Sequence, residues 1–524
     1  MHHFPLVSVL SLDWGQVADT LAVLVIMWVF LSFAGALQRK LRIAKGLVAV
    51  PGPKGTLLLG ILPQMAANIH RFYHFQEDLM KQYGGRMKLP WNIFFDSALY
   101  IASPEDVQHV LSTNFGNYVK PQAMLDAFKE LYEDSLFFVN HTHCRDNGER
   151  WTMLRKVSTK VFTTSNFRVF SRQIFYKYAA SDTIGTIETQ GGKCNMLHVA
   201  RQFTLRSIFD IGCGIPLANL EDPDTFANAL DGVNEHGAMR LLLKRHYKLF
   251  WWCMPSEYKL KRDVSAVASV AEAIVRNRLA EPSEVIAKRS DILSLFVMKA
   301  RELEDAPSWM LEFTTLRSVL MTFVLAGRDT TSSAITYAFY EIVRHPEVQE
   351  KIVKELHQLG TSDLNYDDMK RLPYIDAVLN ETLRLNPPVP FDIKVAAEDD
   401  HLPDGTFVPA GTEIFFSPWY MGRNNSIWGN DPLMFRPERW SEMKTRPSAY
   451  ENPVFQAGPR ICIGMSMALL EAKMFIAVML RHFHVEFQDG EGDVNRERPY
   501  ALNASLMLDC GLPLKMTPRE ARPC

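Results

Sequence analysis

The chain has 524 residues, and its 57 Lys and Arg residues nearly balance its 59 Asp and Glu residues, to a formal net charge of -2. That balance excludes the strong basic excess typical of a nucleic-acid-binding protein. A content of 47% apolar and 22% charged residues excludes a disordered or fibrous chain. The seven cysteines are scattered and form no CxxC pair, which argues against a disulfide framework or a zinc site. We therefore expect a large globular protein of a reducing compartment.

The N-terminal region contains a candidate membrane segment. Residues 21–37 form an uncharged run of 17 residues. As a helix, this run would reach about 26 Å, close to the hydrocarbon core of about 30 Å. The segment before the run carries only acidic charges, and basic residues follow it at once, namely Arg39, Lys40, Arg42 and Lys45. The positive-inside rule therefore places everything after Lys45 in the cytosol.

We interpret residues 1–45 as a single transmembrane anchor with its basic stop. Residues 46–59 contain the sequence VPGPKG and are interpreted as a hinge between the anchor and the body. The alternative is a cleaved signal peptide, because residues 34–36 (AGA) resemble a peptidase site. The basic segment that should precede the apolar run is missing, which argues against cleavage.

Helical periodicity dominates residues 60–524, and this region shows no repeat and no internal domain boundary. We predict helices over residues 71–83, 149–162, 201–209, 264–279, 311–344, 346–359, 374–385 and 465–482. We predict short strands over residues 86–89, 98–101, 393–396 and 412–417. Residues 420–453 lack periodicity, and an ordered coil of that length tends to be functional. The body is therefore expected to be mainly α with a small sheet.

The predicted helix 311–344 is interrupted in its middle by the sequence AGRDTTSS, residues 326–333. Most of these residues are weak helix formers, and Ser or Thr hydroxyls that bond the i−4 carbonyl can bend a helix. A break in local rules within an otherwise consistent element is where function is expected. The alternative is two helices joined by a turn capped at Asp329 or Thr330.

Glu381 and Arg384 lie three residues apart on the predicted helix 374–385 and therefore share one face. Taken alone, this spacing predicts only a surface ion pair that stabilises the helix by about 0.2–0.5 kcal/mol.

Cys462 lies just outside the N-terminus of the predicted helix 465–482. Unpaired N–H groups and the positive end of a helix favour a thiolate over a thiol. Gly458 and Gly464 would allow the backbone to approach a bulky planar ligand, and Arg460 could face an anionic edge of it. The alternative is that Cys462 is a small buried hydrophobic residue.

The order of Phe455, Gly458, Arg460, Cys462 and Gly464 resembles the FxxGxRxCxG signature of the cytochromes P-450, which are haem-thiolate monooxygenases. The resemblance implies that Cys462 is the axial ligand of the haem b iron and that the other four residues bind this cofactor. It also implies a triangular, mainly helical body with a small β region, with residues 60–524 as the catalytic domain. Electrons would come from NADPH through a separate NADPH-cytochrome P-450 reductase, which would bind a basic face near Arg460.

Three further motifs match the same family. Residues 326–331 match its oxygen-binding helix, which implies that Ala326 borders the haem and that Asp329 and Thr330 supply protons to dioxygen. Glu381 and Arg384 would join Arg439, in the sequence FRPERW, in a buried structural triad. Haem propionates would be contacted by the residues that match the WxxxR motif, Trp151 and Arg155, and by Lys394.

Residues 326–331, 402–411 and 435–440 together resemble the plant and fungal fatty-acid and alkane ω-hydroxylases of the microsomal type. The resemblance implies a single-pass protein of the endoplasmic reticulum membrane, with its catalytic domain in the cytosol. It implies hydroxylation of a lipophilic substrate by dioxygen. Candidate substrate-facing residues are strongly apolar and comprise 118–140, Phe323, Ala326, 389–391 and 505–508.

Several alternatives stay open at this point. The substrate could be a terpenoid, a sterol or another lipid. The protein could be a reductase-independent isomerase or dehydratase, although retention of Asp329 and Thr330 argues against this, or a haem sensor or carrier. Residues 241–254 could lie in the membrane interface or pack as an ordinary helix. A metal site is not expected at the four histidines that invite one, His70, His74, His141 and His143, since no Cys or carboxylate cluster accompanies them.

Overall fold

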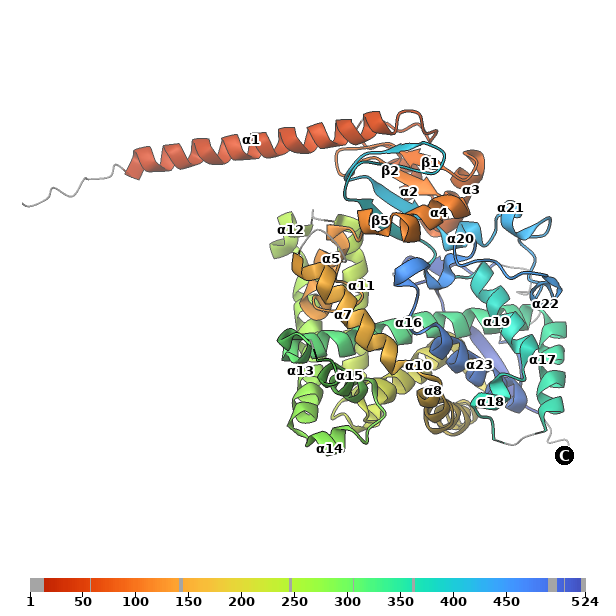
Figure 1. The fold of residues 1–524 in the computed structure, drawn as a ribbon. Helices are drawn as coiled ribbons and strands as arrows, with labels where there is room; N and C mark the ends of the chain where they lie inside the picture. The colour runs from red at the N-terminus through yellow and green to blue at the C-terminus, as the bar shows by residue number, and fades with distance from the viewer. Residues whose placement is uncertain are drawn as a thin grey trace, which may run out of the picture.

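The helix α16 (Phe313–Arg344) passes through the centre of the body in a computed structural model of the chain (Figure 1). The structure describes residues 14–56, 58–140, 145–244, 247–304, 306–360, 363–488, 497–503 and 505–519. Most of α16 is buried, and it packs against α10 (Met196–Cys213), α13 (Pro255–Ala280), α19 (Pro373–Leu385) and α23 (Met465–His482). A Cβ atom at Gly327 would lie 2.7 Å from Cγ1 of Ile208, so the absence of a side chain there lets α16 and α10 approach closely.

The remaining α-helices lie around this centre, except for α1, most of which extends beyond the body (Figure 1). They are α1 (Trp14–Gly46), α2 (Leu62–Ala67), α3 (Phe72–Gln82), α4 (Pro104–Gln108), α5 (Gln122–Ala127), α6 (Lys129–Tyr132), α7 (Arg145–Val161), α8 (Thr164–Phe170), α9 (Ile184–Thr189), α11 (Pro223–Leu243), α12 (Tyr247–Phe250), α14 (Ser283–Ile286), α15 (Ile292–Arg301), α17 (Pro346–Leu359), α18 (Tyr366–Met369), α20 (Pro418–Met421), α21 (Asn425–Trp428) and α22 (Arg439–Glu442).

The main sheet has five strands in the order β1-β2-β8-β5-β3. Its strands are β1 (Met87–Leu89), β2 (Ala98–Ile101), β3 (Tyr118–Val119), β5 (Asp392–Ala396) and β8 (Glu413–Phe416). Strands β2 and β8 are parallel, with Ala98 opposite Glu413, and the other neighbours are antiparallel. The sheet brings residues 118–119 beside the segment that follows α19, although these segments are far apart in the chain.

Three smaller sheets complete the β region. A three-stranded sheet has the order β4-β12-β9, formed by β4 (Lys193–Asn195), β12 (Pro513–Pro518) and β9 (Phe483–Phe487). The two hairpin-like pairs are β6 (Asp400–His401) with β7 (Phe407–Val408), and β10 (Tyr500–Ala501) with β11 (Met507–Leu508).

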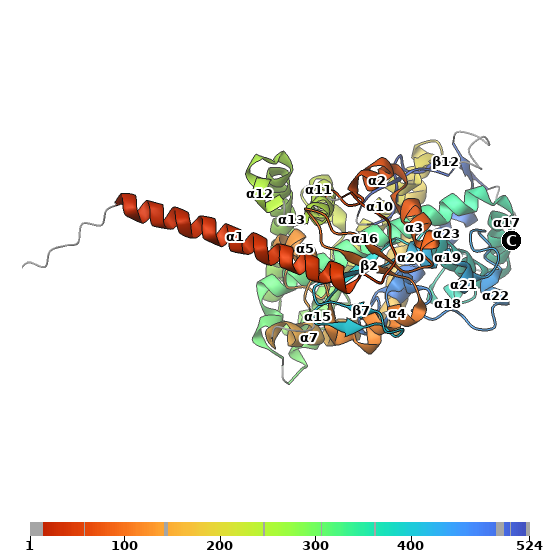
Figure 2. The ribbon, with the colours of Figure 1, turned by 90° about the horizontal axis from the view of Figure 1, so that it is seen from above.

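Helix α1 projects away from the body, and its N-terminal part is clear of the other elements in two perpendicular views (Figures 1 and 2). Its last turns contact the body, where Ile43 and Leu47 are buried and Arg42 pairs with Asp399 over 2.5 Å. Helix α1 contains the predicted span 21–37, and residues 1–13 of the predicted anchor lie outside the described residues. Among the described residues, no helix meets the combined length and apolarity of a bilayer-crossing segment. The transmembrane helix therefore stays a prediction.

The mainly α body with small sheets is confirmed, and each of the eight predicted helices and four predicted strands has a counterpart in the structure. The two-helix alternative for residues 311–344 is wrong, because α16 is continuous from Phe313 to Arg344. Helices α11 and α15 were missed. Glycines such as Gly232 and Gly237 weaken the helical pattern of α11, but both are needed there, since a Cβ atom would lie 2.0 Å from Asp263 Oδ2 and 2.2 Å from Phe128 Cε1, respectively.

Candidate active site

The predicted loop around Cys462, residues 455–464, which we call the thiolate loop, leads directly into the N-terminus of α23. Two short 3-10 turns, Pro453–Phe455 and Gly458–Arg460, precede Cys462. The Cys462 N–H donates a hydrogen bond to the Phe455 carbonyl over 2.8 Å, which closes the loop around the cysteine. The loop is therefore shaped by its own backbone hydrogen bonds.

The Cys462 side chain is exposed to solvent, yet burial among protein atoms raises the pKa of its thiol. The N–H groups of Gly464 and Met465 at the start of α23, together with the charge of Arg155, oppose that rise. The predicted stabilisation of a thiolate by the helix end is present, but burial outweighs it. Cys462 has solvent-accessible area, and protein atoms also surround it on most sides. We therefore infer that its sulfur borders an internal space and not the outer surface of the protein.

The two glycines of the loop differ in what they permit. Gly458 has a φ of 63°, and a Cβ atom there would lie 2.1 Å from the Leu111 carbonyl oxygen. The backbone at Leu111 therefore requires glycine at this position, and close approach of Gly458 to a planar ligand stays a prediction. Gly464 has no protein atom within 4 Å of its Cβ position, so open space lies beside it.

Gln456 is a loop residue that sequence reasoning missed. It adopts a φ of 62° and a ψ of -176°, a conformation that is rare outside glycine and costs of the order of 1–3 kcal/mol. Its side-chain amide donates to the Asp392 carboxylate on β5. Gln456 thus ties the loop to the sheet, and a one-dimensional pattern contains no signal for such a contact.

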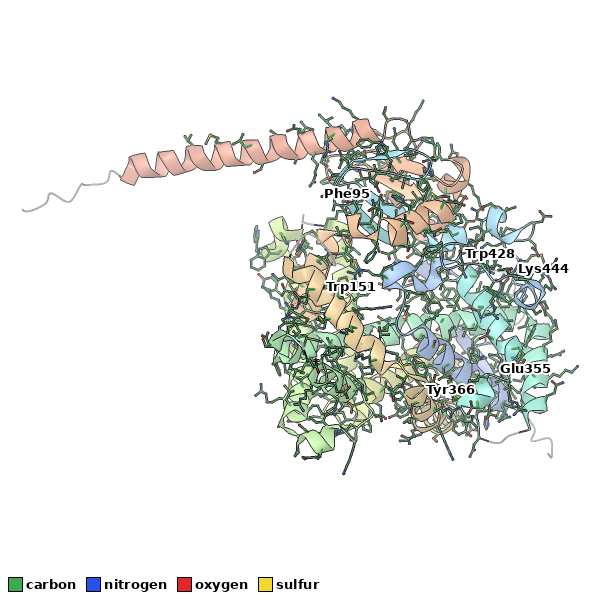
Figure 3. All side chains as sticks on the ribbon, in the orientation of Figure 1. Phe95, Trp151, Glu355, Tyr366, Trp428 and Lys444 are labelled. Carbon is green, nitrogen blue, oxygen red and sulfur yellow. The ribbon has the colours of Figure 1, made fainter. Side chains whose placement is uncertain are left out.

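Basic side chains from four separate elements gather beside Cys462. Arg155 on α7 donates to the Ile461 carbonyl over 2.8 Å, and the Arg460 guanidinium lies over the Trp151 ring at 4.8 Å. Trp151 is labelled on α7 in Figure 3. The other two basic residues, Lys120 after β3 and Lys394 on β5, are both buried. We call Lys120, Arg155, Lys394 and Arg460 the cation cluster.

The charges of the cation cluster act on one another. Burial lowers the pKa of Lys120 well below its ordinary value, the charges of Arg460 and Lys394 lower it further, and Asp392 opposes both effects. Burial likewise lowers the pKa of Arg460 to about 10. Within the described ranges, Asp392 is the one carboxylate that raises the pKa of Lys120 or Arg460. Asp392 also pairs with Lys394 over 3.1 Å. The cluster therefore places four basic side chains and one opposing carboxylate close together in a largely buried place.

This donor set fits haem. A thiol that faces an internal space is the ligand type of a haem-thiolate iron, and buried cations suit two carboxylates at one edge of a planar group. The structure brings together all of the residues predicted for this edge, namely Trp151, Arg155, Lys394 and Arg460. Lys120 was assigned to the substrate-facing segment 118–140 instead, because only the fold reveals that it approaches Arg460.

The residues predicted to handle protons lie in the middle of α16. The Thr330 hydroxyl donates to the Ala326 carbonyl over 2.7 Å, the i−4 bond expected from the sequence, and the Ala326 side chain is exposed although most of α16 is buried. Asp329 is buried, and its Oδ2 accepts a hydrogen bond from Asn234 on α11 over 2.8 Å. Burial raises the pKa of Asp329, whereas Arg328 and Arg201 oppose that rise.

Three of the predicted substrate-facing segments meet around α16. The Ser333 hydroxyl donates to the Leu506 carbonyl over 2.6 Å, and the Leu506 N–H donates to the Pro388 carbonyl over 2.8 Å. These bonds place residues 505–508 and the segment 389–391 beside the same helix as Phe323. Val389 and Phe137 remain exposed, whereas Phe323 is buried.

Glu381, Arg384 and Arg439 form one fully buried group. Glu381 pairs with Arg384 over 2.7 Å and with Arg439 over 3.0 Å, and it also accepts hydrogen bonds from the Trp440 indole and the Arg436 backbone. The side chains of Glu381 and Arg384 are 0% exposed, so the surface ion pair that the spacing alone suggests is wrong.

The two arginines of this group extend into the coil before Cys462. Arg384 donates to the carbonyls of Gly422, Pro432 and Met434, and its guanidinium lies 4.9 Å from the Trp428 ring, which Figure 3 labels. Arg439 donates to the Asp431 and Met434 carbonyls. Residues 420–453 are therefore held largely by buried charges, although the predicted coil is interrupted by the short helices α21 and α22.

Of the four histidines considered as metal ligands, His74 has other partners in the structure. His74 contacts the Tyr500 hydroxyl at 3.2 Å and Glu497 at 3.1 Å. Over the ranges that the structure describes, no three His, Cys, Asp or Glu residues are grouped to hold a metal ion. His141 and His143 lie outside those ranges.

We predict that Glu381→Gln lowers the free energy of unfolding by about 3–5 kcal/mol, because the buried Arg384 loses its counter-charge and the buried Arg439 keeps only Asp431. The matched control is Glu302→Gln, which breaks an exposed i,i+3 pair with Lys299 and should cost about 0.5 kcal/mol or less. Equilibrium unfolding in urea, followed by circular dichroism, measures both. An equal loss of unfolding free energy in the two variants would contradict the claim that Glu381 neutralises buried arginines. If Glu381→Gln does not fold, Arg439→Lys provides a milder version of the same comparison.

Comparison with known proteins agrees with this geometry. A family model described as Cytochrome P450 matches residues 50–508. The chain is 31% identical over 516 residues to Cytochrome P450 704B1 of Arabidopsis thaliana, covering 88% of this chain and 93% of that relative. It is 29% identical over 489 residues to Cytochrome P450 94A1 of Vicia sativa, covering 90% and 91%. It is also 29% identical over 500 residues to Cytochrome P450 86B1 of Arabidopsis thaliana, covering 90% and 86%.

The family match extends over both the thiolate loop and α16. Membership implies a haem iron, dioxygen, a lipophilic substrate and a redox partner. The chain therefore belongs to the cytochrome P450 family and is a haem-thiolate monooxygenase.

Proposed function

We propose that this monooxygenase is anchored in the endoplasmic reticulum membrane and hydroxylates a fatty acyl chain near its end. The observation that carries the proposal is the internal Cys462 thiol beside the cation cluster. In the proposed reaction, RH, dioxygen, two electrons and two protons give ROH and water. NADPH would supply the electrons through a separate reductase that binds near Arg460.

Haem b would be held by Cys462 at the iron and by the cation cluster at the propionates, with Trp151 alongside Arg460. When bound, haem would supply the activation of dioxygen, and a thiolate ligand favours cleavage of the O–O bond. The other residues of the motif, Phe455, Gly458 and Gly464, set the path of the loop that presents the sulfur.

The chain's own contribution to the reaction is to manage protons and exclude water. Asp329 would hold a proton at its carboxyl group, and its raised pKa favours the protonated form that a general acid needs. Thr330 bonds to the Ala326 carbonyl beside the exposed face of α16, and its hydroxyl would pass the proton onward. The mainly apolar segments around α16 would keep bulk water from the reacting carbon.

The proposed substrate class rests on sequence resemblance. Residues 326–331, 402–411 and 435–440 resemble fatty-acid and alkane ω-hydroxylases, and the surroundings of Phe323 and Val389 are apolar, as an acyl chain requires. The same lining would suit a terpenoid or a sterol, so the test must include these lipids.

The proposed anchor is α1. Its described apolar side chains Val23, Met27 and Leu31 are exposed, and the basic residues after the apolar run lie toward the body. Trp251 and Trp252, in the short turn that follows α12, are also exposed. Exposed tryptophans are typical of residues that lie in a membrane interface. We assign residues 1–45 to the anchor, 46–59 to the hinge and 60–524 to the catalytic domain, which would lie in the cytosol. The proposed hinge packs on the body, since the Lys88 N–H donates to the Pro51 carbonyl.

We expect the purified full chain, reconstituted with reductase and NADPH, to convert medium-to-long fatty acids to hydroxy acids oxidised near the methyl end. Mass spectrometry of the products against a panel that includes terpenoids and sterols measures this. Hydroxylation of a terpenoid or sterol alone would contradict the fatty-acid assignment. Turnover of a lipid hydroperoxide without NADPH, and with no hydroxylation, would contradict the oxygen-inserting function.

We expect Lys120→Met to release haem about tenfold faster, because one charge-assisted contact to a propionate is worth about 1.5–3 kcal/mol. Transfer of haem from the holoenzyme to an acceptor protein measures the rate. Lys129→Met removes an exposed lysine from the neighbouring helix α6 and should leave the rate unchanged. An unchanged rate in Lys120→Met would contradict the assignment of Lys120 to the haem edge.

We expect the double variant Met27→Lys and Leu31→Lys to leave the membrane fraction, since a charged residue within a bilayer costs about 2.5–3.5 kcal/mol. Alkaline extraction of membranes followed by immunoblotting measures the distribution. The control variant, Leu433→Lys with Met434→Lys, changes two equally exposed apolar residues on the body and should stay with the membrane. Full retention of the α1 variant would contradict the proposed anchor.

A further inference from the structure

Helices α11 and α16 meet through two pairs of polar side chains at the predicted proton-handling site. Asp231 and Asn234 lie one turn apart on α11, and they face the consecutive residues Arg328 and Asp329 of α16. The Arg328 guanidinium bonds Asp231 over 2.5 Å, and the Asn234 amide donates to Asp329 over 2.8 Å. On α11, the hydrogen-bonding partner of Arg328 is therefore a charged residue, whereas that of Asp329 is neutral.

Three buried polar atoms at this contact have no hydrogen bond within the part of the chain that is described. They are Oδ1 of Asp329, Oδ1 of Asn234 and Nε of Arg328, and the first two lie on the side chains that bond each other. Buried polar atoms without partners are uncommon in folded proteins and mark places where an additional proton or water is accommodated. The carboxyl group and the amide therefore have unused capacity for hydrogen bonding directly beside their existing bond.

The charged and titratable groups around Asp329 come from four helices. Arg328 on its own helix lies 3.6 Å away, Asp231 comes from α11, Arg201 from α10 and Tyr132 from α6. Arg201 is 3.6 Å from Asp231, so part of its charge is compensated there. Hence, among the residues that the structure describes, no cation lies within hydrogen-bonding distance of the Asp329 carboxylate, and Asn234 is its hydrogen-bonding side-chain partner.

An amide is suited to a carboxyl group that changes its protonation state. The NH2 group of Asn donates to a carboxylate, and its carbonyl oxygen accepts from a protonated carboxyl after the amide turns over. A lysine or arginine at the same place would stabilise only the ionised form, and an apolar residue would bond neither form. Asn234 is therefore chemically able to hold Asp329 in place both before and after it gives up a proton.

We propose that Asn234 is a positioning residue that keeps the Asp329 carboxyl group aligned for proton delivery in both of its protonation states. The inference rests on the proposed role of Asp329 as proton donor and deepens it. In each cycle, the O–H bond of the Asp329 carboxyl breaks, the proton goes to dioxygen under reduction, and solvent returns a proton to the carboxylate. Because Asn234 lies on α11, the alignment depends on how α11 sits against α16.

The first test is Asn234→Leu, which keeps the size of the side chain and removes its hydrogen bonding. The matched control is Asn228→Leu on the exposed face of α11. We expect both variants to retain the carbon monoxide spectrum and substrate affinity of the wild type. In Asn234→Leu alone, kcat should fall about tenfold at unchanged KM, as expected for misaligned general acid catalysis. Hydrogen peroxide formed per NADPH and the solvent isotope effect should both rise.

The second test is Asn234→Asp, which keeps the shape of the side chain and places a second carboxyl group against Asp329. Two adjacent carboxyl groups share one proton and raise the pKa of the pair. At low pH the shared proton restores the hydrogen bond, so coupling of NADPH use to product should persist. Above the raised pKa of the pair, repulsion should abolish that coupling, whereas the wild type should stay coupled. A merely structural hydrogen bond predicts no such pH dependence.

A third readout needs no turnover. Infrared spectroscopy of the resting enzyme follows the carbonyl band of the protonated Asp329 carboxyl, identified by its loss in Asp329→Asn. Because the Asn234 amide lowers the pKa of Asp329, its removal in Asn234→Leu should move the titration of this band to higher pH.

Unchanged coupling in Asn234→Leu, an unshifted infrared titration, or a pH profile of Asn234→Asp identical to wild type would each overturn the proposal. Failure of the wild type to hydroxylate any fatty acid would overturn the proposed substrate instead. It would leave the infrared titration and the peroxide measurement as tests of Asn234.

Discussion

The constraint on which the rest of this structure depends is the crowding of four basic side chains in the cation cluster. Lys120, Arg155, Lys394 and Arg460 approach one another in a largely buried place, and Asp392 alone, among the described residues, opposes the effect of neighbouring positive charges on the pKa of Lys120. Crowding of like charges away from water is costly, and the cost falls when an anionic ligand enters. Haem, with two carboxylates at one edge, is such a ligand, so its binding and the stability of the fold are expected to be coupled.

Two sets of polar contacts fix the position of Cys462 relative to the cation cluster. In the first set, Gln456 bonds the thiolate loop to β5, and the Phe455 carbonyl accepts from the Cys462 N–H within the loop. The backbone at Gln456 is strained as a result. In the second set, Arg384 and Arg439, both paired with Glu381, bond backbone carbonyls of the segment before the loop. Both sets use charged or polar side chains away from water, where a misplaced group loses hydrogen-bonding energy. They therefore favour a single arrangement of an irregular segment.

The long helices could be predicted from the sequence because their signals are local. The periodicity of α17 and the apolar run of α23 require no knowledge of distant residues, and their observed ends agree with the pattern. Helix α11 could not be predicted in this way. Gly232 and Gly237 dilute its pattern, and the reason for each glycine is a side chain on another element. Tertiary contact, not intrinsic propensity, decides the sequence there.

The residues of the site also fall into those with a local sequence signal and those whose contacts depend on the fold. Cys462, Glu381 and Asp329 stand in motifs with fixed spacing, and the resemblance of those motifs to the family predicts a role for each residue. Lys120 and Asn234 stand in no motif, because each acquires its partner only when strands or helices far apart in the chain are brought together. Gly458 stands in the motif, but its contact with the backbone at Leu111 could not be predicted from the sequence, because that contact depends on the fold.

The most direct test of the account is the absorption spectrum of the purified, reduced protein with carbon monoxide. A sulfur ligand at Cys462 predicts the red-shifted Soret band of a thiolate-ligated carbonyl complex, and Cys462→His should bind haem without that band. A folded, haem-containing wild type that lacks the red-shifted band, or a Cys462→His variant that keeps it, would contradict the central claim.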